Sequence, residues 1–139
     1  MARRRSTETQ GGHMKRGRGG TRPDIGIFVR SGWEANYCRY LNLIKSAGLI
    51  TDWAYEPDTF EFEGIRRGTR FYTPDFKLTH PDGTVEYVEI KGWMDPKSKT
   101  KLKRMLKYHP KVTVTVIGLA DYLSLAYKWR SKIPNWEGD

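Results

Sequence analysis

The sequence predicts an α/β fold, in which a mixed β-sheet is flanked by helices and the elements follow the order α-β-β-β-β-α-β-α. Apolar residues recur with helical spacing between Trp33 and Ile44. A turn sequence, Pro81-Asp82-Gly83, separates two segments with strand character. A helix-start sequence, Asp95-Pro96, precedes a second helix and then a β-branched segment. Helical and strand patterns therefore alternate along one chain.

The first predicted helix begins near Trp33 and ends near Gly48, a favourable residue for a C-terminal stop. Ser31 and Glu34 have the spacing of a capping box, in which Ser is the N-cap and Glu is at N3. Cys38 lies inside this helix, where we expect it to pack rather than to act as a nucleophile. The apolar face has the i, i+4, i+7, i+8, i+11 pattern, at Trp33, Tyr37, Tyr40, Leu41 and Ile44.

Four strands are predicted to follow, at residues 53–56, 60–63, 70–78 and 85–91. The first two are expected to be joined by a turn at Pro57-Asp58. The last two are expected to form a β-hairpin, because proline presets φ and glycine accepts positive φ at the turn between them.

A second helix is predicted from its N-cap, Asp95, to about Tyr108. It is followed by a β-branched strand at residues 112–117, which we expect to be buried, and by a last helix that contains Leu119 and Ala126. These elements complete the predicted order.

The length and charge of the chain restrict its function. A chain of 139 residues is enough for one domain with one core, and its formal net charge is +9. Such a charge favours an anionic partner, usually a nucleic acid. A membrane-spanning helix is not expected, because no apolar run approaches the roughly 20 residues that it needs. No secretory signal is recognised and Cys38 is the only cysteine, so we expect no internal disulfide and a cytoplasmic location.

Residues 1–22 are predicted to be a disordered basic tail, and residues 23–139 a single folded domain. The tail has seven Lys or Arg against one acid, and five glycines, with almost no apolar side chains. It is suited either to follow phosphates or to keep the chain soluble, and its composition favours neither role.

Asp75, Glu89 and Lys91 form the candidate catalytic group. Side chains alternate between the faces of a strand, so Glu89 and Lys91 point the same way, and Asp75 lies on the partner strand of the hairpin. The two carboxylates and the backbone carbonyl of Ile90 would form a hard oxygen site for Mg²⁺ or Mn²⁺. Lys91 would orient water or stabilise a pentavalent phosphate. A cross-strand Glu–Lys pair is, however, also a common surface feature.

A strongly basic segment follows this group. Residues 91–111 hold eight Lys or Arg against a single acid, Asp95. This charge would attract a polyanion whose backbone must reach a metal, although a solvated helix face explains most of these lysines equally well. The candidate DNA contacts in the segment are Lys97, Lys99, Lys101, Lys103 and Arg104.

Three motifs in order are similar to those of a nuclease superfamily. They are Arg30-Ser31-Gly32-Trp33-Glu34, Tyr72-Thr73-Pro74-Asp75-Phe76 and Val88-Glu89-Ile90-Lys91-Gly92-Trp93. Together they resemble the PD-(D/E)XK superfamily, and within it the phage endonuclease I type of Holliday-junction resolvase. The resemblance implies a restriction-endonuclease-like core and a metal-dependent enzyme that cuts branched DNA.

By this resemblance, Asp75 and Glu89 are metal-binding carboxylates and Lys91 is the catalytic lysine. Glu34 is a helix-borne catalytic acid, which would be a further metal or water ligand in addition to its capping role. The resemblance also implies a homodimer that cuts two opposed strands of a four-way junction, in the host cytoplasm if a phage encodes the chain. Further candidate DNA contacts are Arg30, Ser31, Arg66, Arg67 and Arg70.

Two alternatives stay open at this point. The chain is also compatible with a PD-(D/E)XK nuclease of other specificity, such as a nicking or restriction-type enzyme. A non-catalytic basic DNA-binding protein, whose acids are structural, is the other alternative. The complete set of Asp75, Glu89 and Lys91 argues against this last interpretation.

Overall fold

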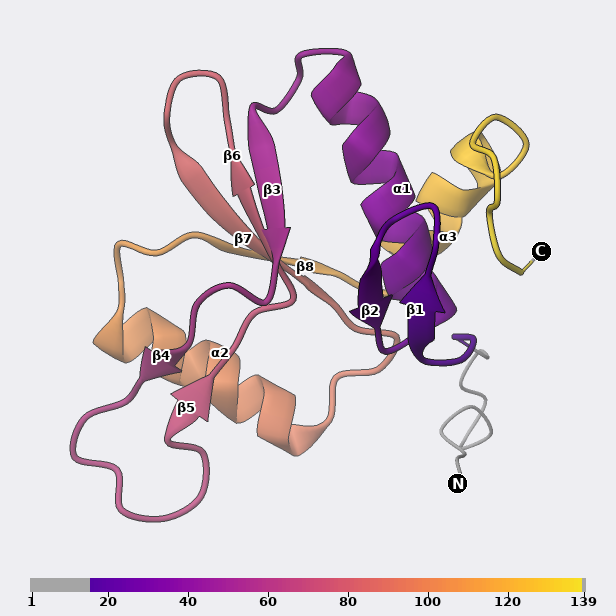
Figure 1. Ribbon diagram of the computed structural model, residues 1–139. Coiled ribbons are helices and arrows are strands. Elements are labelled where there is room, and N and C mark those ends of the chain that lie inside the picture. The colour runs from indigo at the N-terminus through magenta and orange to yellow at the C-terminus, as the bar shows by residue number, and fades with distance from the viewer. Residues whose placement is uncertain (1–15, 139) are drawn as a thin grey trace.

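A computed structural model describes residues 16–138, which form a mixed α/β structure (Figure 1). The helices in this range are α1 (Gly32–Ser46), α2 (Pro96–Tyr108) and α3 (Leu119–Trp129). The strands are β1 (Gly20–Arg22), β2 (Ile27–Val29), β3 (Asp52–Tyr55), β4 (Phe60–Glu61), β5 (Phe71–Tyr72), β6 (Phe76–Thr79), β7 (Val85–Ile90) and β8 (Val114–Ile117). None of the helices in the described range is both long and apolar enough to cross a membrane.

The central sheet has four strands in the order β3-β6-β7-β8. Strands β3, β6 and β7 are antiparallel neighbours, whereas β8 runs parallel to β7. The predicted mixed sheet is therefore confirmed. Two smaller antiparallel pairs, β1 with β2 and β4 with β5, stand apart from it.

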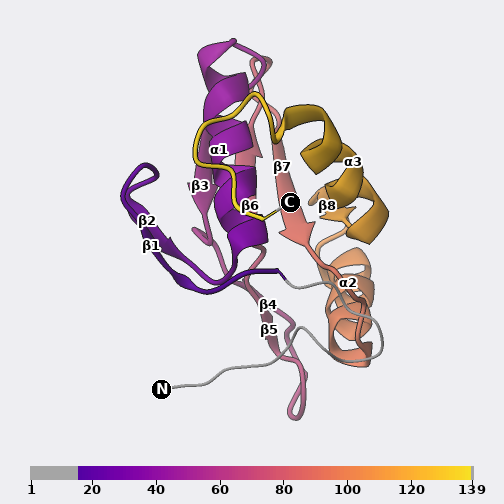
Figure 2. The same cartoon turned by 90° about the vertical axis from the view of Figure 1, so that its right-hand side faces the viewer.

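Helices lie on both sides of the central sheet (Figures 1 and 2). One face presents Phe76, Val88 and Ile90 to α1 and α3, in the larger hydrophobic cluster. Side chains alternate along β7, so Tyr87 and Glu89 belong to the opposite face. That face is covered by α2 and by the β4–β5 pair, whose buried contacts are made by Phe62, Tyr72 and Met105.

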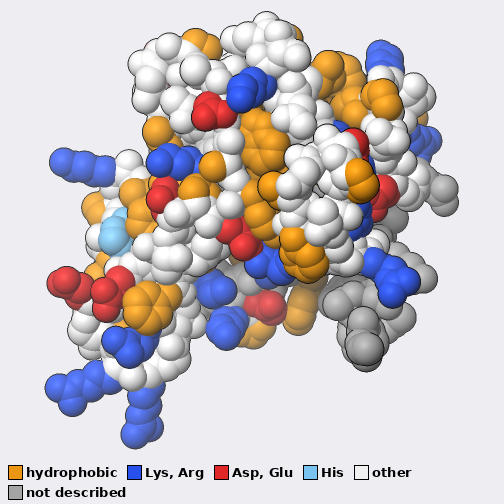
Figure 3. Space-filling model, viewed as in Figure 1, with side chains coloured by type: hydrophobic (Ala, Val, Ile, Leu, Met, Phe, Trp, Pro, Cys, Tyr) orange, Lys and Arg blue, Asp and Glu red, His pale blue; other side chains and the backbone are white. Residues whose placement is uncertain are grey.

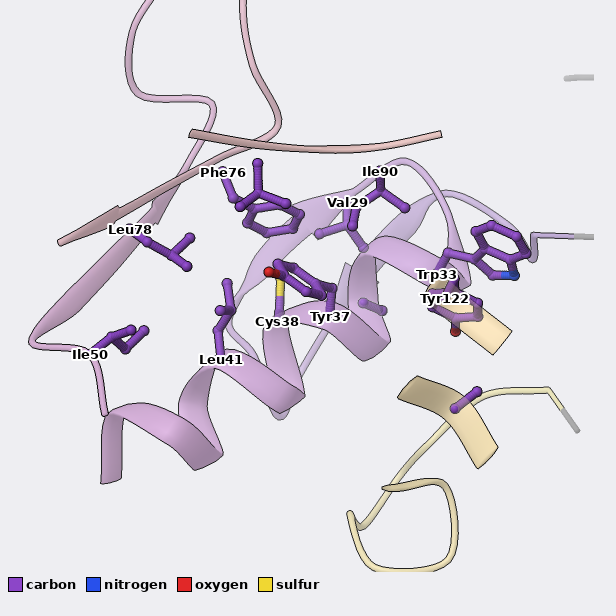
Figure 4. Packing of buried hydrophobic residues seen from close by; sticks show 13 residues of the cluster. Val29, Trp33, Tyr37, Cys38, Leu41, Ile50, Phe76, Leu78, Ile90 and Tyr122 are labelled. Carbon is purple, nitrogen blue, oxygen red and sulfur yellow. The ribbon is translucent and has the colours of Figure 1, made fainter. Parts of the chain in front are cut away.

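The larger cluster is organised around the buried side of α1 (Figure 4). Cys38 and Leu41 from this helix are fully buried, together with Phe76 from β6. Burial raises the pKa of the Cys38 thiol to about 12, so the thiol stays protonated. The predicted packing role of this cysteine is confirmed.

The ends of α1 and α2 follow the predicted capping chemistry. The Ser31 hydroxyl accepts a hydrogen bond from the Glu34 N–H at 3.2 Å, and the Asp95 carboxylate accepts one from the Ser98 N–H at 2.6 Å. Gly48 follows α1 with a φ of +80°, a conformation that favours glycine. These local preferences explain why both helices begin where the sequence predicts.

Three strand predictions need correction. Residues 70–78 form two strands, β5 and β6, because Pro74 has no N–H to continue the ladder. The strand predicted at residues 60–63 is confined to Phe60–Glu61, which pairs with β5, whereas the preceding strand β3 pairs with β6. Strand β8 is half-buried along its whole length, rather than buried.

The predicted boundary of the basic tail is also wrong. Residues 20–22 form β1, which pairs with β2, and Arg22 makes an ion pair with Glu137 at 2.7 Å. Backbone pairing and this long-range ion pair therefore hold a segment whose composition has no apolar pattern. Residues 1–15 of the predicted tail lie outside the described residues.

Candidate active site

A cavity of about 610 Å³ lies where α1, the break between β5 and β6, and the end of β7 meet. Its lining brings together every residue of the predicted catalytic and metal-binding set: Glu34, Asp75, Glu89, Ile90 and Lys91. Residues far apart in the sequence thus converge on one space.

The break at Pro74 positions the two central carboxylates. Asp75 follows the break, and its Oδ2 accepts a hydrogen bond from the Ile90 N–H at 2.8 Å. The Asp75 N–H points to Glu89 Oε1 at 3.4 Å. The Asp75 carboxylate therefore accepts the hydrogen bond from the Ile90 N–H that a backbone carbonyl would accept in a regular antiparallel pair. This substitution brings both carboxylates to the same end of the sheet.

Burial makes the ionised forms of these two acids unfavourable. Asp75 is 2% exposed, and its pKa is raised to about 8, first by burial and then by the charges of Glu89 and Glu34. Burial also raises the pKa of Glu89, while the Tyr72 hydroxyl and the Lys91 ammonium oppose the rise. The pair holds more negative charge than its surroundings compensate, which is a property of sites that bind cations.

Glu34 does not complete the predicted capping box. Its backbone N–H is capped by Ser31. Its Oε1 accepts hydrogen bonds from the Arg30 N–H at 2.9 Å and from the Tyr55 hydroxyl at 2.7 Å. A complete box would place this oxygen on the Ser31 N–H. The buried carboxylate instead turns to the cavity.

Two guanidinium groups lie on atoms that the sequence predicts as metal ligands. Arg30 Nη2 is 2.8 Å from Asp75 Oδ1, and the same side chain forms ion pairs with Glu34 and Glu56. Arg16 Nη2 donates to the Ile90 carbonyl oxygen at 3.4 Å. The two guanidinium groups therefore contact the atoms that are expected to bind the metal ion. Arg30, predicted as a DNA contact, is here a counter-ion of the acids.

Sequence reasoning missed the hydroxyl groups that hold the acids. The buried Tyr72 donates to Glu89 Oε1 at 2.9 Å, and Tyr55 donates to Glu34. Burial, and then the charge of the neighbouring carboxylate, raises the pKa of both tyrosines, so both remain donors. Tyr72 lies inside the motif that includes Asp75, but its hydrogen bond to Glu89 could be identified only in the folded structure.

Six of the other predicted DNA contacts are exposed, on two segments of the chain. Lys97, Lys99 and Lys103 are exposed on α2, and Arg66, Arg67 and Arg70 are exposed between β4 and β5. Figure 3 shows Lys and Arg side chains that project from this part of the molecule. Lys101 differs from its neighbours because it lines the cavity, with Nζ 5.8 Å from the centre of the Tyr72 ring.

Two of the residues predicted as DNA contacts have structural roles. Ser31 lines the cavity, is 6% exposed, and caps α1 with its hydroxyl. Arg104 donates to the Thr69 carbonyl oxygen, which ties α2 to the segment before β5. Both side chains serve the fold around the cavity.

The donor set suits a hard divalent cation. The carboxylates of Asp75 and Glu89 and the carbonyl of Ile90 supply oxygen ligands, which Mg²⁺ and Mn²⁺ prefer. Within residues 16–138, no three or more His, Cys, Asp or Glu side chains are grouped as a ready metal site. The third carboxylate, Glu34, is instead tied to Arg30 and Tyr55. The fit therefore depends on two acidic side chains and one carbonyl.

Comparisons with known proteins identify a family without a described activity. Residues 25–137 match the family DUF1064, which is described as a protein of unknown function. No curated protein and no solved structure matches the chain. The match includes the residues around the cavity from Arg30 to Lys101.

Proposed function

The chain belongs to the DUF1064 family, and we propose that it is a metal-dependent, structure-selective endodeoxyribonuclease that resolves four-way junctions and other branched DNA. The observation that carries the proposal is the meeting of Asp75, Glu89 and Lys91 with Glu34 on one cavity. The basic side chains beside that cavity would attract a phosphate backbone. The mixed sheet with helices on both sides is compatible with a restriction-endonuclease-like core, which is part of the proposal.

In this proposal, Asp75, Glu89 and the Ile90 carbonyl hold Mg²⁺ or Mn²⁺. When bound, the ion supplies Lewis-acid activation of the scissile phosphate and of the attacking water. The Tyr72 hydroxyl orients Glu89, and the Ile90 N–H orients Asp75. The protein thus fixes the ligands before a substrate arrives.

Lys91 and Glu34 serve the phosphate and the water. Lys91 lies beside Glu89 on the cavity, where its positive charge would stabilise negative charge that develops on the phosphate. Glu34 is oriented by Tyr55 and would accept a hydrogen bond from the attacking water. The Arg30 guanidinium contacts Asp75, the carboxylate proposed to hold the ion. If the ion took its place there, the guanidinium would be free to contact a phosphate.

Paired cleavage requires two active sites. A homodimer with two-fold symmetry would present two cavities to the two opposed strands of a junction. The substrate would be DNA in the cytoplasm of the cell, or of the host if a phage encodes the chain.

One assay separates this function from its alternatives. The full chain is incubated with a labelled four-way junction, a matched linear duplex and single strands, in Mg²⁺ or in EDTA. Symmetric nicks near the crossover, in Mg²⁺ only, are the expected result. Duplex cleavage without preference for the junction would indicate a nuclease of other specificity. Binding without cleavage in Mg²⁺ or Mn²⁺ would refute both enzymatic functions.

A further inference from the structure

An exposed aromatic ring stands at the rim of the acidic cavity. Phe71 in β5 lines the cavity, and 51% of the residue is exposed. Its neighbour in the strand, Tyr72, is buried and holds Glu89. Because successive side chains of a strand point to opposite sides, the anchored Tyr72 ring directs Phe71 outward. The ring is therefore fixed beside the carboxylates without packing against a core.

The segment that carries this ring is firmly attached at its base. Phe62 and Tyr72 pack with Met105 of α2 in the second hydrophobic cluster. The Phe62 N–H donates to the Arg70 carbonyl oxygen at 2.8 Å, and Arg104 ties the segment to α2 through Thr69. These contacts limit the conformational entropy that the ring would lose on binding a planar partner.

Cationic side chains accompany the ring on its own segment and in the cavity. The Arg70 guanidinium lies over Phe71, 5.3 Å from the ring centre, and Lys101 lines the same cavity. Arg66 and Arg67 are exposed at the far end of the segment. An aromatic ring among cationic side chains is the arrangement that binds unpaired nucleotides, because bases stack on the ring while the cations contact phosphates.

We propose that Phe71 is a stacking platform for an unpaired or unstacked nucleobase next to the phosphate that enters the cavity. This inference rests on the proposed function, because it places a DNA strand in the cavity. A base inside a regular duplex is stacked on its neighbours and cannot meet the ring without being extruded. Phe71 would thus select strands at branch points, where bases unstack most readily. It is a specificity residue, whereas the acids carry the chemistry.

Equilibrium binding in EDTA tests this inference without cleavage. Fluorescence anisotropy is measured for a labelled four-way junction, a single strand and a linear duplex with the full chain. Phe71→Ala should weaken binding to the junction and the single strand by roughly tenfold, the effect of losing one base–aromatic stack. Duplex binding and its dependence on salt should not change, because no charge is lost. Phe71→Trp should bind the junction as well as the wild type does.

Phe28→Ala is the matched control. Phe28 is another exposed phenylalanine on a short strand, 59% exposed, but it does not line the cavity. Its replacement should leave all three affinities unchanged. Equal weakening on the duplex and the junction, or no weakening by Phe71→Ala, would overturn the stacking role. If the chain binds branched DNA through Phe71 but never cleaves it, the proposed nuclease function fails and the stacking site stands. Absence of binding to all three DNAs would overturn both.

Discussion

Replacing Arg30 with methionine removes a counter-ion of the acids in the cavity. Its guanidinium forms ion pairs with Asp75, Glu34 and Glu56, at 2.8 Å and 3.5 Å for the first two. The Asp75 and Glu34 side chains are 2% and 4% exposed, so few water molecules can replace the lost partner. Methionine keeps the aliphatic length of arginine without its charge. The variant should therefore fold with reduced stability.

The loss of stability can be estimated from the burial of Arg30 and of the acids that it contacts. Removing one partner of a buried ion pair costs about 3–5 kcal/mol. The Arg30 side chain is 56% exposed, which screens part of its interaction with the acids, and Asp75 can take up a proton because its pKa is about 8. We expect a loss of about 2–3 kcal/mol near neutral pH in EDTA. For a domain of this size, that is a fall in Tm of roughly 10 °C.

Addition of Mn²⁺ should reduce the difference in stability between the variant and the wild type. An ion bound only to the folded chain stabilises it by about 2.7 kcal/mol at a hundredfold excess over its Kd. Without Arg30 on Asp75, the variant should bind Mn²⁺ about tenfold more tightly, which adds about 1.4 kcal/mol. Urea denaturation in EDTA and in Mn²⁺ measures both stabilities, and isothermal titration calorimetry measures the affinity.

Arg130→Met is the control for the loss of an arginine. Arg130 is the C-cap of α3 and is exposed, with its guanidinium near the Tyr127 ring rather than the cavity. Its replacement should not change the response to Mn²⁺. Equal stabilisation of the wild type and Arg30→Met by Mn²⁺ would show that Arg30 and the ion do not share a site.

Three other perturbations address the ligands, the phosphate contacts and the fold. Tyr72→Phe should lower the affinity for Mn²⁺ by roughly 10- to 100-fold, because it removes the hydrogen bond that orients Glu89; calorimetry that finds an unchanged Kd would exclude this role. Replacing Arg66 and Arg67 together by Ala should reduce the slope of log K against log salt by about 2 for a junction, unless these side chains touch no phosphate. The pKa of Glu137 lies below its ordinary value, chiefly because Arg22 donates hydrogen bonds to the carboxylate. The stability that this carboxylate contributes is present above its unfolded pKa and is lost as the pH falls through its folded pKa. Glu137→Gln should therefore flatten the fall in urea stability below about pH 4.5, and curves of the same shape would contradict the proposed contribution.

The helices could be predicted because their ends have strong local preferences. Ser31 and Asp95 cap α1 and α2 through their own side chains, so each start depends on neighbouring residues alone. The hairpin of β6 and β7 was predictable for the same reason, since Gly83 adopts a φ of +89° at its turn.

Features that depend on distant partners could not be predicted in this way. Strand β1 has no apolar alternation, and it is held by pairing with β2 and by the Arg22–Glu137 ion pair. Pro74 was visible in the sequence, but its effect, the division of one strand into two, depends on the separate pairing of β5 with β4. Both cases show tertiary contacts that override local pattern.

Strand geometry made part of the candidate site predictable. Strand parity and the hairpin place Asp75 and Glu89 together, and the structure brings both to one cavity. The positions of Arg16 and Arg30 on the expected ligand atoms were not foreseen, because arginine side chains are long and find their partners only in the folded chain. The same holds for the Tyr72 and Tyr55 hydroxyl groups.

The most direct measurement compares cleavage and binding by Asp75→Asn on a labelled four-way junction. Asn keeps the shape of the side chain and can still accept a hydrogen bond from Ile90, but it removes the charge that would hold the ion. The variant is expected to bind the junction as the wild type does and to leave it uncut in Mg²⁺, while the wild type cleaves it in Mg²⁺ and not in EDTA. Cleavage by Asp75→Asn at the rate of the wild type, or cleavage by the wild type in EDTA, would contradict a metal-dependent nuclease centred on Asp75.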